Sequence, residues 1–356
     1  MIERVAIVGA GTMGAGIAQL CAQSGLSVAV HDPIPAALAA LTGRLSAALA
    51  SAVSKGKLTR ADAARALERV RTAPALDDLA GSQFVIEAAP EDLALKQELF
   101  ARLSRALPEA ILATNTSSLA VRDALARVES PERALGLHFF NPPAAMRLVE
   151  LVRAPATGES AFALARSFAQ DALGRVPVEV ADTPGFIVNR VMRPYYVRAQ
   201  ALLGPSAGVH AVDAACRELG GVPMGPFELM DLIGLDVNLA ITRSIYEALG
   251  RPERFTPPTL QAELVARGAL GRKSGRGFYL YDAGRKVGEN PQARPPRPGA
   301  ASPAQAWRQL RDALAEEADR LVAEGGATPE SVDRAITLAM NFPRGPFQWR
   351  REGASA

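Results

Sequence analysis

The sequence predicts an α/β fold, in which a doubly wound parallel sheet is followed by an all-helical region. Two observations support this prediction. Apolar strand-like runs alternate with amphipathic helical patterns as far as about Val180, which is typical of a parallel sheet. Beyond Asp182-Thr183-Pro184-Gly185 the strand signal fades, and helical patterns continue to about Tyr281.

The first elements form a βαβ unit. Residues 4–8 are a β-branched apolar run, a glycine turn and a helical pattern follow, and residues 26–30 form a second strand. A helical hairpin is expected over residues 36–71, in which Thr59 followed by Asp62 is typical of a helix start. Further strands are expected at residues 84–88, 111–113, 135–139 and 148–152.

Length and composition bound the domain organisation. The chain has 356 residues, 48% hydrophobic and 22% charged, which suffices for two cores and excludes disordered, collagen-like and disulfide-stapled proteins. Five prolines between Pro291 and Pro303 predict an extended linker. The predicted boundaries are 1–183 for the sheet domain, 184–284 for the helical domain, 285–304 for the linker and 305–356 for a partial second helical repeat.

The second repeat is predicted from an internal duplication. Asp213 precedes Gly225-Pro226-Phe227 by the same 12 residues that separate Asp333 from Gly345-Pro346-Phe347. We interpret the second copy as a truncated helical repeat, in which both aspartates cap helices or hold the Gly-Pro turn. We also expect residues 305–356 to pack on the first helical copy.

Charge and cysteine usage exclude several kinds of partner. The chain has 40 Lys and Arg against 37 Asp and Glu, a net charge of +3 without a basic run, so no nucleic acid or membrane partner is predicted. Two distant cysteines, Cys21 and Cys216, fit free thiols in a reducing compartment. The chain has no uninterrupted apolar run of about 18 residues and begins in a strand. We therefore expect a cytoplasmic protein, and we predict no metal site.

A glycine-rich turn predicts a dinucleotide site. The pattern Gly-x-Gly-x-x-Gly lies between the first strand and helix, where backbone amides and the helix N-terminus can approach a pyrophosphate. Asp32 ends the second strand, where a carboxylate can accept the ribose hydroxyls and repel a 2′-phosphate, so NAD is expected in preference to NADP. The alternative is a turn residue before proline. The turn residues are Gly9, Gly11, Thr12, Met13 and Gly14.

His138 and Glu150 are a candidate acid–base pair. His138 lies at the end of a predicted strand, where open α/β sheets bind ligands. Glu150 interrupts the next apolar strand, where a carboxylate is costly to bury unless it is paired. If the two strands meet, Glu150 could accept the imidazole N–H and orient the ring. From spacing alone, separate structural roles are an open alternative.

Two further polar positions follow predicted elements. Ser117 belongs to the polar run 114–118 after a strand, and Asn189 lies shortly after the predicted domain boundary. Both could equally be loop or helix-capping residues. The residues alone therefore do not decide their roles.

Taken together, the chain resembles the L-3-hydroxyacyl-CoA dehydrogenase family, of the 3-hydroxybutyryl-CoA type. The resemblance runs from about residue 3 to about residue 283. It rests on GAGTMGAGIA, ATNTSSL, HFFNPP with VEL, DTPGFIVNR and GRKSGRGFYLYD, in the family's order. It implies a Rossmann-type NAD domain and an all-helical domain that completes the site. It also implies a homodimer, or a monomer if the second repeat covers the dimer surface.

The resemblance implies roles for individual residues. His138 resembles the general base and Glu150 the carboxylate that holds it. Ser117 and Asn189 resemble the residues that hydrogen-bond the substrate oxygen. The family's CoA contacts lie on the helical hairpin, where Lys57 is the candidate. Positions near the nicotinamide half of NAD are matched by Glu91, Lys96, Asn141 and Lys273.

The implied reaction is the reversible NAD-dependent oxidation of an L-3-hydroxyacyl-CoA to the 3-ketoacyl-CoA. The pathway would be β-oxidation-type or aromatic-degradation metabolism. The acyl group stays open, since Arg147 or Arg193 could favour a dicarboxylate but the sequence places neither in a pocket. Two alternatives are a sibling dehydrogenase of a free hydroxy acid, such as a sugar acid or carnitine, and a non-catalytic NAD-binding protein.

Overall fold

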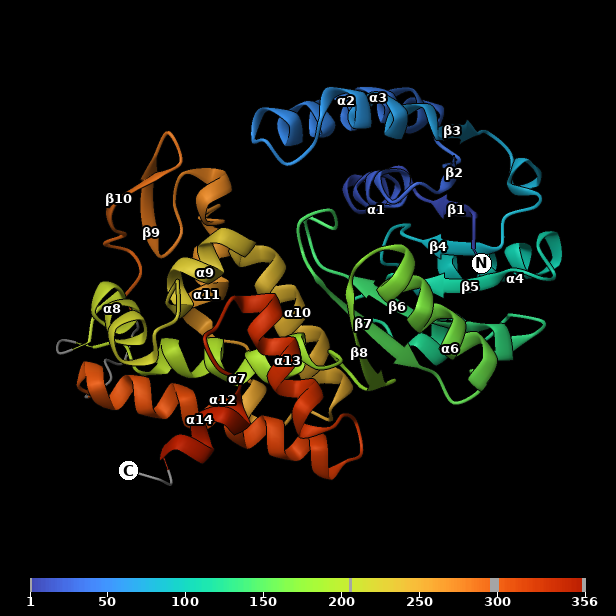
Figure 1. The fold of residues 1–356 in the computed structure, drawn as a ribbon. Helices are drawn as coiled ribbons and strands as arrows, with labels where there is room; N and C mark the ends of the chain where they lie inside the picture. Colours follow the sequence, from blue (N-terminus) through green and yellow to red (C-terminus); the bar gives the residue numbers. More distant parts are fainter. Residues whose placement is uncertain (1, 205–206, 295–300, 354–356) are drawn as a thin grey trace. The chain divides into compact units, whose positions relative to one another are not determined.

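The computed structural model describes residues 2–204, 207–294 and 301–353. The chain forms two compact units, Met1–Thr183 and Pro184–Ala356. The first contains a large sheet, and the second consists mainly of helices (Figure 1).

The first unit is an eight-stranded sheet with the strand order β3-β2-β1-β4-β5-β6-β7-β8. All neighbouring strands pair in parallel except β6 and β7, which are antiparallel. The Rossmann-type fold class is therefore confirmed, with one pair that differs from the predicted parallel sheet. The elements are β1 (Arg4–Val8), α1 (Thr12–Gln23), β2 (Ser27–His31), α2 (Pro35–Ser54), α3 (Arg60–Glu68), β3 (Val70–Ala73), η1 (Leu76–Leu79), β4 (Phe84–Glu87), α4 (Leu93–Ala106), β5 (Ile111–Thr114), α5 (Val121–Ala124), η2 (Pro131–Arg133), β6 (Ala134–Phe139), β7 (Leu148–Arg153), α6 (Glu159–Ser167), η3 (Phe168–Ala172) and β8 (Val176–Ala181).

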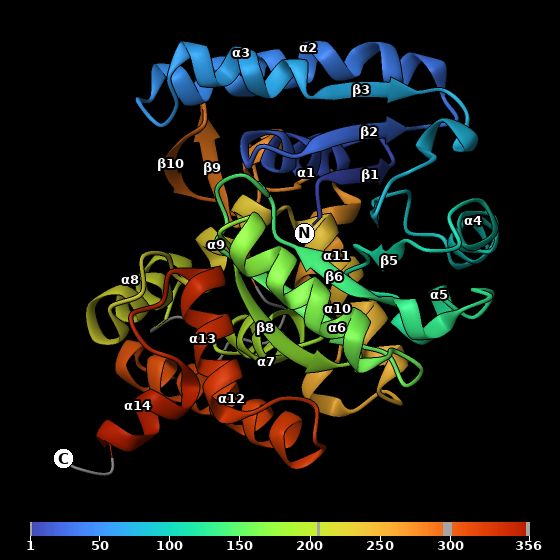
Figure 2. The ribbon, with the colours of Figure 1, turned by 45° about the vertical axis from the view of Figure 1, so that its right-hand side comes forward.

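Helices cover both faces of this sheet. The central strands β4 and β5 are buried at every residue, which explains their continuous apolar sequences. One face packs against α1, α2, α3 and α6 (Figure 2). On this face Phe84 of β4 stacks on Phe168, with 4.5 Å between the ring centroids. The strand order runs in opposite directions from β1 to β2 and from β4 to β5, so right-handed crossovers place α4 on the other face.

This reversal of strand order creates a switch point between β1 and β4. Open α/β sheets bind their ligands in the crevice beyond the carboxyl ends of the strands at such a point. The turn after β1 and the segment after β4 therefore border the position where the sequence predicts the dinucleotide.

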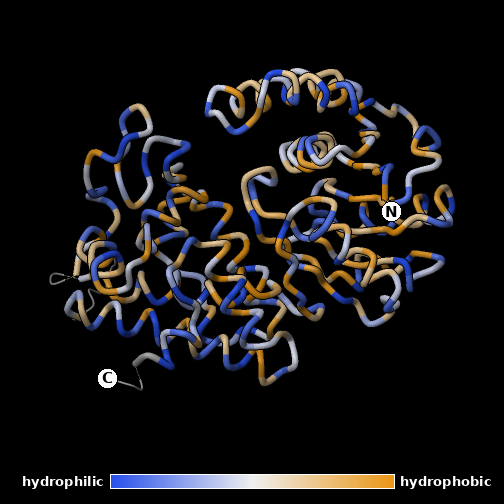
Figure 3. Tube along the Cα trace, viewed as in Figure 1, coloured by the Kyte–Doolittle hydropathy of each residue, from blue (hydrophilic) through white to orange (hydrophobic). Residues whose placement is uncertain are grey.

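The predicted helical hairpin is formed by α2 and α3. The Thr59 hydroxyl accepts a hydrogen bond from the Asp62 amide at 3.1 Å, which caps α3 as expected. In the part of the chain that the structure describes, α2 alone is long and apolar enough to cross a membrane by length and composition. Its leucines are nevertheless buried in the core, and hydrophilic residues recur along both helices (Figure 3). We therefore interpret α2 as a helix that packs on the core along its leucine face.

Three strands lie where other structure was predicted, and one of them is β9 (Tyr279–Asp282), within the region expected to be all-helical. Val70–Ala73, which overlaps the end of the expected hairpin, is strand β3, and its largely exposed residues suit a sheet edge beside β2. Arg285–Glu289, expected in the linker, is strand β10 and pairs with β9 through a turn in which Ala283 and Gly284 both have positive φ. Residues 295–300 of the predicted linker lie outside the described residues.

Within residues 184–204, 207–294 and 301–353, the regular structure of the second unit is helical apart from this hairpin and isolated β-bridges.

The two aspartates of the duplicated motif accept hydrogen bonds from the start of the following helix, as predicted. Asp213 accepts hydrogen bonds from the amides of Phe227 and Glu228, both at 3.0 Å, and Asp333 accepts one from the Phe347 amide at 2.9 Å. The elements are α7 (Val188–Ala201), α8 (Val209–Gly220), α9 (Pro226–Ile233), α10 (Leu235–Ala248), η4 (Glu253–Phe255), α11 (Thr259–Ala266), η5 (Arg272–Ser274), β9 (Tyr279–Asp282), β10 (Arg285–Glu289), α12 (Pro303–Ala323), α13 (Pro329–Met340) and α14 (Pro346–Gly353).

Helix α12 docks the second copy onto the first, as expected. It packs against α7 and α8, and the Trp307 ring lies so close to Gly220 that a Cβ there would meet it at 2.5 Å. Arg190 of α7 is fully buried and pairs with Glu317 at 2.8 Å and Glu324 at 2.7 Å. Arg254 pairs with Glu317 from the other side at 2.5 Å. A buried ion-pair cluster thus joins the two copies.

Removing Glu317 should loosen this junction. Glu317→Ala removes the buried carboxylate that pairs with the Arg190 guanidinium, and breaking a buried pair costs about 3–5 kcal/mol. Both tryptophans of the chain, Trp307 and Trp349, lie in the second copy, so their fluorescence during denaturant unfolding reports this junction directly. The matched control is Glu316→Ala, which removes an exposed carboxylate and should change the free energy of unfolding by less than about 0.5 kcal/mol. Equal effects of the two changes would contradict the prediction.

Candidate active site

The glycine turn after β1 is shaped by two close approaches and one open position. Gly9 has a φ of +107°, and a Cβ there would lie 2.5 Å from the Ala88 carbonyl oxygen beyond β4. A Cβ on Gly14 would lie 1.8 Å from the Gly9 oxygen, so both positions exclude a side chain. Nothing lies within 4 Å of a Cβ built on Gly11. The turn therefore leaves open space over the N-terminus of α1, where a pyrophosphate is stabilised.

Asp32 and Arg44 hold this turn from the adjacent elements. The half-buried Asp32 carboxylate accepts hydrogen bonds from the amides of Ala10 at 2.8 Å and Ile34 at 2.9 Å. Asp32 therefore also has the role that was the alternative to ribose binding, namely that of a residue that stabilises the turn before a proline. Arg44 of α2 donates to the Ala10 carbonyl at 2.5 Å. The sequence analysis missed this contact because Arg44 comes from a later helix. The open glycine position and the carboxylate at the end of β2 fit NAD.

His138 and Glu150 form a buried pair on neighbouring strands. Because β6 and β7 are antiparallel, the two residues stand directly opposite each other in the register. His138 Nδ1 and Glu150 Oε2 are 2.7 Å apart, and the side chain of Glu150 is fully buried. Phe140 packs against the imidazole with 4.6 Å between ring centroids. The two strands meet, which is the condition under which Glu150 was expected to hold the imidazole.

Asn115 ties the neighbouring strand ends together. Its side-chain oxygen accepts a hydrogen bond from the Phe139 amide at 2.8 Å, at the end of β6. Its own amide donates to the Glu87 carbonyl at 2.8 Å, at the end of β4. The loop that carries Ser117 is thereby fixed at the same sheet edge as His138. The sequence analysis did not assign Asn115 a role, because its partners are distant in sequence.

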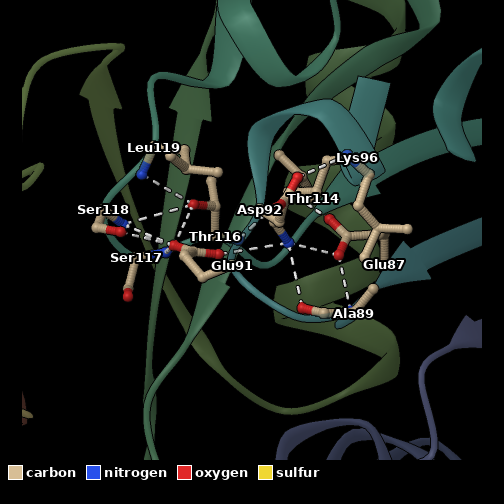
Figure 4. A network of polar contacts seen from close by, with 11 residues as sticks. Glu87, Ala89, Glu91, Asp92, Lys96, Thr114, Thr116, Ser117, Ser118 and Leu119 are labelled. Carbon is tan, nitrogen blue, oxygen red and sulfur yellow. Dashed lines mark hydrogen bonds and ion pairs between the residues drawn. The ribbon is translucent and has the colours of Figure 1, made fainter. Parts of the chain in front are cut away.

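Glu91 organises the loop around Ser117 (Figure 4). Its Oε1 accepts hydrogen bonds from the Thr116 hydroxyl at 2.6 Å, the Ser118 hydroxyl at 2.9 Å and the amides of Ser117 and Ser118 at 3.0 Å. The Ser117 hydroxyl points away from this network (Figure 4). Burial opposes ionisation of Glu91, but the Lys96 charge and these hydrogen bonds outweigh it and hold the pKa of the carboxyl below its usual value of 4.5.

Lys96 and Glu87 form a second buried ion pair beside Glu91. Lys96 is 1% exposed, and its Nζ lies 2.5 Å from Glu87 Oε1 and 3.4 Å from Glu91 Oε2. The Thr114 hydroxyl donates to the other Glu87 oxygen at 2.6 Å. Glu87 was missed in the sequence, although a carboxylate that ends a buried strand is the same signal that identified Glu150.

The remaining candidates are divided between the two units. Asn141 is exposed in the loop after β6, and Lys57 is exposed in the turn between α2 and α3. Asn189 and Lys273 belong to the second unit. Asn189 is half-buried in the first turn of α7, and Lys273 is partly exposed and pairs with Asp236 at 2.7 Å. The structure thus brings His138 together with Glu150. It also brings Glu91 and Lys96 together with the loop that carries Ser117.

The Rossmann-type sheet, its glycine turn and the buried histidine–carboxylate pair define an NAD-dependent oxidoreductase. Comparison with family models agrees with this class. The model described as "3-hydroxyacyl-CoA dehydrogenase, NAD binding domain" matches residues 4–183, and the model described as "3-hydroxyacyl-CoA dehydrogenase, C-terminal domain" matches residues 185–281 and 309–352. The chain belongs to the 3-hydroxyacyl-CoA dehydrogenase family, and its cofactor is NAD.

Individual relatives give the same assignment. The chain is 44% identical over 292 residues to 3-hydroxyadipyl-CoA dehydrogenase of Escherichia coli K12, covering 80% of this chain but about 60% of that protein. It is 43% identical over 283 residues to 3-hydroxybutyryl-CoA dehydrogenase of Mycobacterium tuberculosis H37Rv, covering 79% of this chain and 99% of that protein. The crystal structure of 3-hydroxybutyryl-CoA dehydrogenase from Escherichia coli K12 superposes with a TM-score of 0.90 and 33% identity. That superposition covers 99% of this chain and 92% of that one.

The Glu91 network should make part of the stability depend on pH. A carboxyl whose pKa is lower in the folded state stabilises the fold above its unfolded pKa of about 4.5, and this contribution is lost as the pH falls through the folded pKa. The destabilisation by Glu91→Gln should therefore be largest near pH 7 and shrink below about pH 4.5, as measured by denaturant unfolding across pH 3–7. Glu98→Gln, at an exposed carboxylate, is the control. A pH-independent difference for Glu91→Gln would refute this assignment.

Proposed function

We propose that the protein catalyses the reversible NAD-dependent oxidation of an L-3-hydroxyacyl-CoA to the 3-ketoacyl-CoA. The buried His138–Glu150 pair, at the sheet edge that also carries the Ser117 loop, is the observation that carries this proposal. The relatives named for 3-hydroxybutyryl-CoA and 3-hydroxyadipyl-CoA support a thioester substrate. The reaction would belong to β-oxidation-type or aromatic-degradation metabolism in the cytoplasm.

The mechanism follows from how the imidazole is held. Glu150 engages Nδ1 of His138, so the exchange of a proton with the substrate falls to Nε2. His138 takes the proton of the 3-hydroxyl as the carbonyl forms, and the C3–H bond breaks with its electron pair leaving as hydride. Bound NAD⁺ supplies the hydride acceptor. Glu150 stabilises the imidazolium that results, in a buried site where this attraction is strong.

Other residues hold the reactants. Ser117 and Asn189 would hydrogen-bond the 3-oxygen, and the Glu91 and Asn115 contacts would keep the Ser117 loop in place. Lys57, an exposed cation on the hairpin, suits a CoA phosphate. The residues proposed for NAD are Gly9, Gly11, Thr12, Met13, Gly14 and Asp32 at the turn, and Glu91, Lys96, Asn141 and Lys273 toward its nicotinamide half.

Loss of either member of the pair should slow the reaction without removing the cofactor site. A positioned general base contributes roughly 10²- to 10⁴-fold in rate, so His138→Ala and Glu150→Gln should each lower kcat by at least about 100-fold. NADH binding, followed by its fluorescence, should stay unchanged because Asp32 and the glycine turn are intact. Glu179→Gln replaces an exposed carboxylate on β8 and is the matched control. A near-wild-type kcat for either variant of the pair would refute the assigned roles.

The thioester requirement separates this function from a dehydrogenase of free hydroxy acids. We expect NADH oxidation with acetoacetyl-CoA and none with acetoacetate or a keto sugar acid at matched concentrations. Stopped or continuous absorbance assays at 340 nm follow the reaction. Turnover with a free acid alone would move the protein to the sibling dehydrogenases. Measurable NADH binding without turnover of any of the three would contradict the proposed short-chain activity.

A further inference from the structure

Asp231 of α9 is a buried carboxylate to which the proposed reaction assigns no role. It is 1% exposed and accepts hydrogen bonds from the amides of Phe278 at 2.8 Å and Tyr279 at 2.9 Å and from the Tyr281 hydroxyl at 3.0 Å. Burial raises the pKa of Asp231 to about 6, although these hydrogen bonds oppose the shift. Neutral donors offset the cost of burying a carboxylate only in part, so an aspartate is a costly residue at this position.

The two amide donors directly follow a tight loop formed by residues 271–277. The loop is closed by a hydrogen bond from the Gly271 amide to the Arg276 carbonyl at 2.8 Å. Both ends of the loop pack on Asp231. A Cβ built on Gly271 would lie 2.3 Å from the Asp231 backbone oxygen, and a Cβ built on Gly277 would lie 2.0 Å from the Asp231 Oδ1. The carboxylate therefore fixes the 271–277 loop at the point where the loop closes.

Lys273 lies within this loop, and its side chain runs along the turn between α9 and α10. A Cβ built on Gly234, between the two helices, would lie 3.3 Å from the Lys273 Cε. The Lys273 Nζ pairs with Asp236 Oδ1 of α10 at 2.7 Å. The Lys273 side chain is nevertheless 47% exposed, which leaves its ammonium group accessible to a ligand.

We propose that Asp231 is a positioning residue for the cofactor, which acts by holding the 271–277 loop so that Lys273 is placed to contact NAD. This inference rests on the proposed function, in which Lys273 contacts the nicotinamide half of NAD. A lysine carries its charge on a flexible four-carbon stem, so the ammonium group is placed only if its backbone is fixed. The ion pair with Asp236 is partly exposed, and such pairs contribute little by themselves. The buried contact at Asp231 is therefore the one that determines where Lys273 lies.

The carboxylate form of residue 231 is needed for this role. Three donors converge on its two oxygens, and both oxygens are acceptors. Asp231→Asn keeps the size of the side chain but replaces one acceptor oxygen with an NH2 group, which must then face an N–H or O–H donor. The substitution therefore displaces the segment that ends the 271–277 loop.

The test is a double-mutant cycle in which NADH affinity is measured by NADH fluorescence. Lys273→Met should weaken NADH binding at least about 10-fold, because a charged hydrogen-bond donor is lost. Asp231→Asn should weaken it at least about 5-fold. The double variant should bind no more than about 2-fold more weakly than Lys273→Met, because Asp231 acts through Lys273. Effects of the two changes that multiply would show that Asp231 acts elsewhere and would overturn the inference.

Steady-state kinetics separate this role from a general loss of stability. Asp231→Asn should raise the KM for NADH and leave kcat at saturating NADH within about 2-fold, since the change removes binding alone. Asp333→Asn is the matched control, because Asp333 is also buried and accepts the Phe347 amide in the second helical copy. The control should leave the KM for NADH unchanged. A similar rise of this KM in both variants would overturn the inference.

Gly277→Ala tests the same contact with the carboxylate in place, so the inference can be tested even if Asp231→Asn fails to fold. The added methyl group would lie 2.0 Å from the Asp231 Oδ1 and must displace the loop, so NADH binding should weaken at least about 5-fold. Gly288→Ala is the control, because a Cβ built there meets nothing within 4 Å. Wild-type affinity for NADH in Gly277→Ala would overturn the inference.

The outcomes also separate this inference from the proposed reaction. Wild-type NADH affinity in Lys273→Met would overturn the role of Asp231, while turnover of acetoacetyl-CoA by the wild-type protein would leave the reaction standing. Absence of that turnover, together with the expected pattern of NADH affinities, would refute the reaction and support the role of Asp231.

Discussion

The antiparallel pairing of β6 with β7 is the constraint on which the active site depends. In the parallel part of the sheet, each strand end contributes its polar residues from a separate loop. The antiparallel pair instead sets His138 and Glu150 opposite each other on two hydrogen-bonded strands. A shift of one residue would send the Glu150 side chain to the opposite face of the sheet. The ladder between the two strands therefore fixes the carboxylate on the imidazole without help from a flexible loop.

A chain of polar contacts extends this rigidity to the rest of the sheet edge. Asn115 links the end of β6 to the end of β4, and the buried Glu87–Lys96 pair supports the segment from which Glu91 reaches the Ser117 loop. These buried charges satisfy one another, which avoids the cost of an isolated charge in the core. Of the residues proposed to contact the 3-oxygen and the nicotinamide, Ser117, Glu91 and Lys96 are thus held by this network.

Local patterns in the sequence were sufficient for part of this picture. The glycine turn, Asp32, and a carboxylate within the apolar strand of Glu150 each carry their signal within a few residues. Strands β3, β9 and β10 escaped prediction, because short strands at an exposed edge lack the apolar run that marks a central one. The antiparallel pairing, and the contacts of Asn115 and Arg44, depend on partners that the fold brings from distant segments. Glu87 carries the same local signal as Glu150, a carboxylate in a buried apolar strand, and was nevertheless overlooked.

The two buried arginines of α7 show what the chain does with a charge in its interior. Arg190 is neutralised by Glu317 and Glu324, which the second helical copy supplies. Arg193, less than one turn further along the same helix, receives neutral acceptors alone. The carboxylates of the second copy therefore offset the desolvation of Arg190, which neutral acceptors alone offset less well.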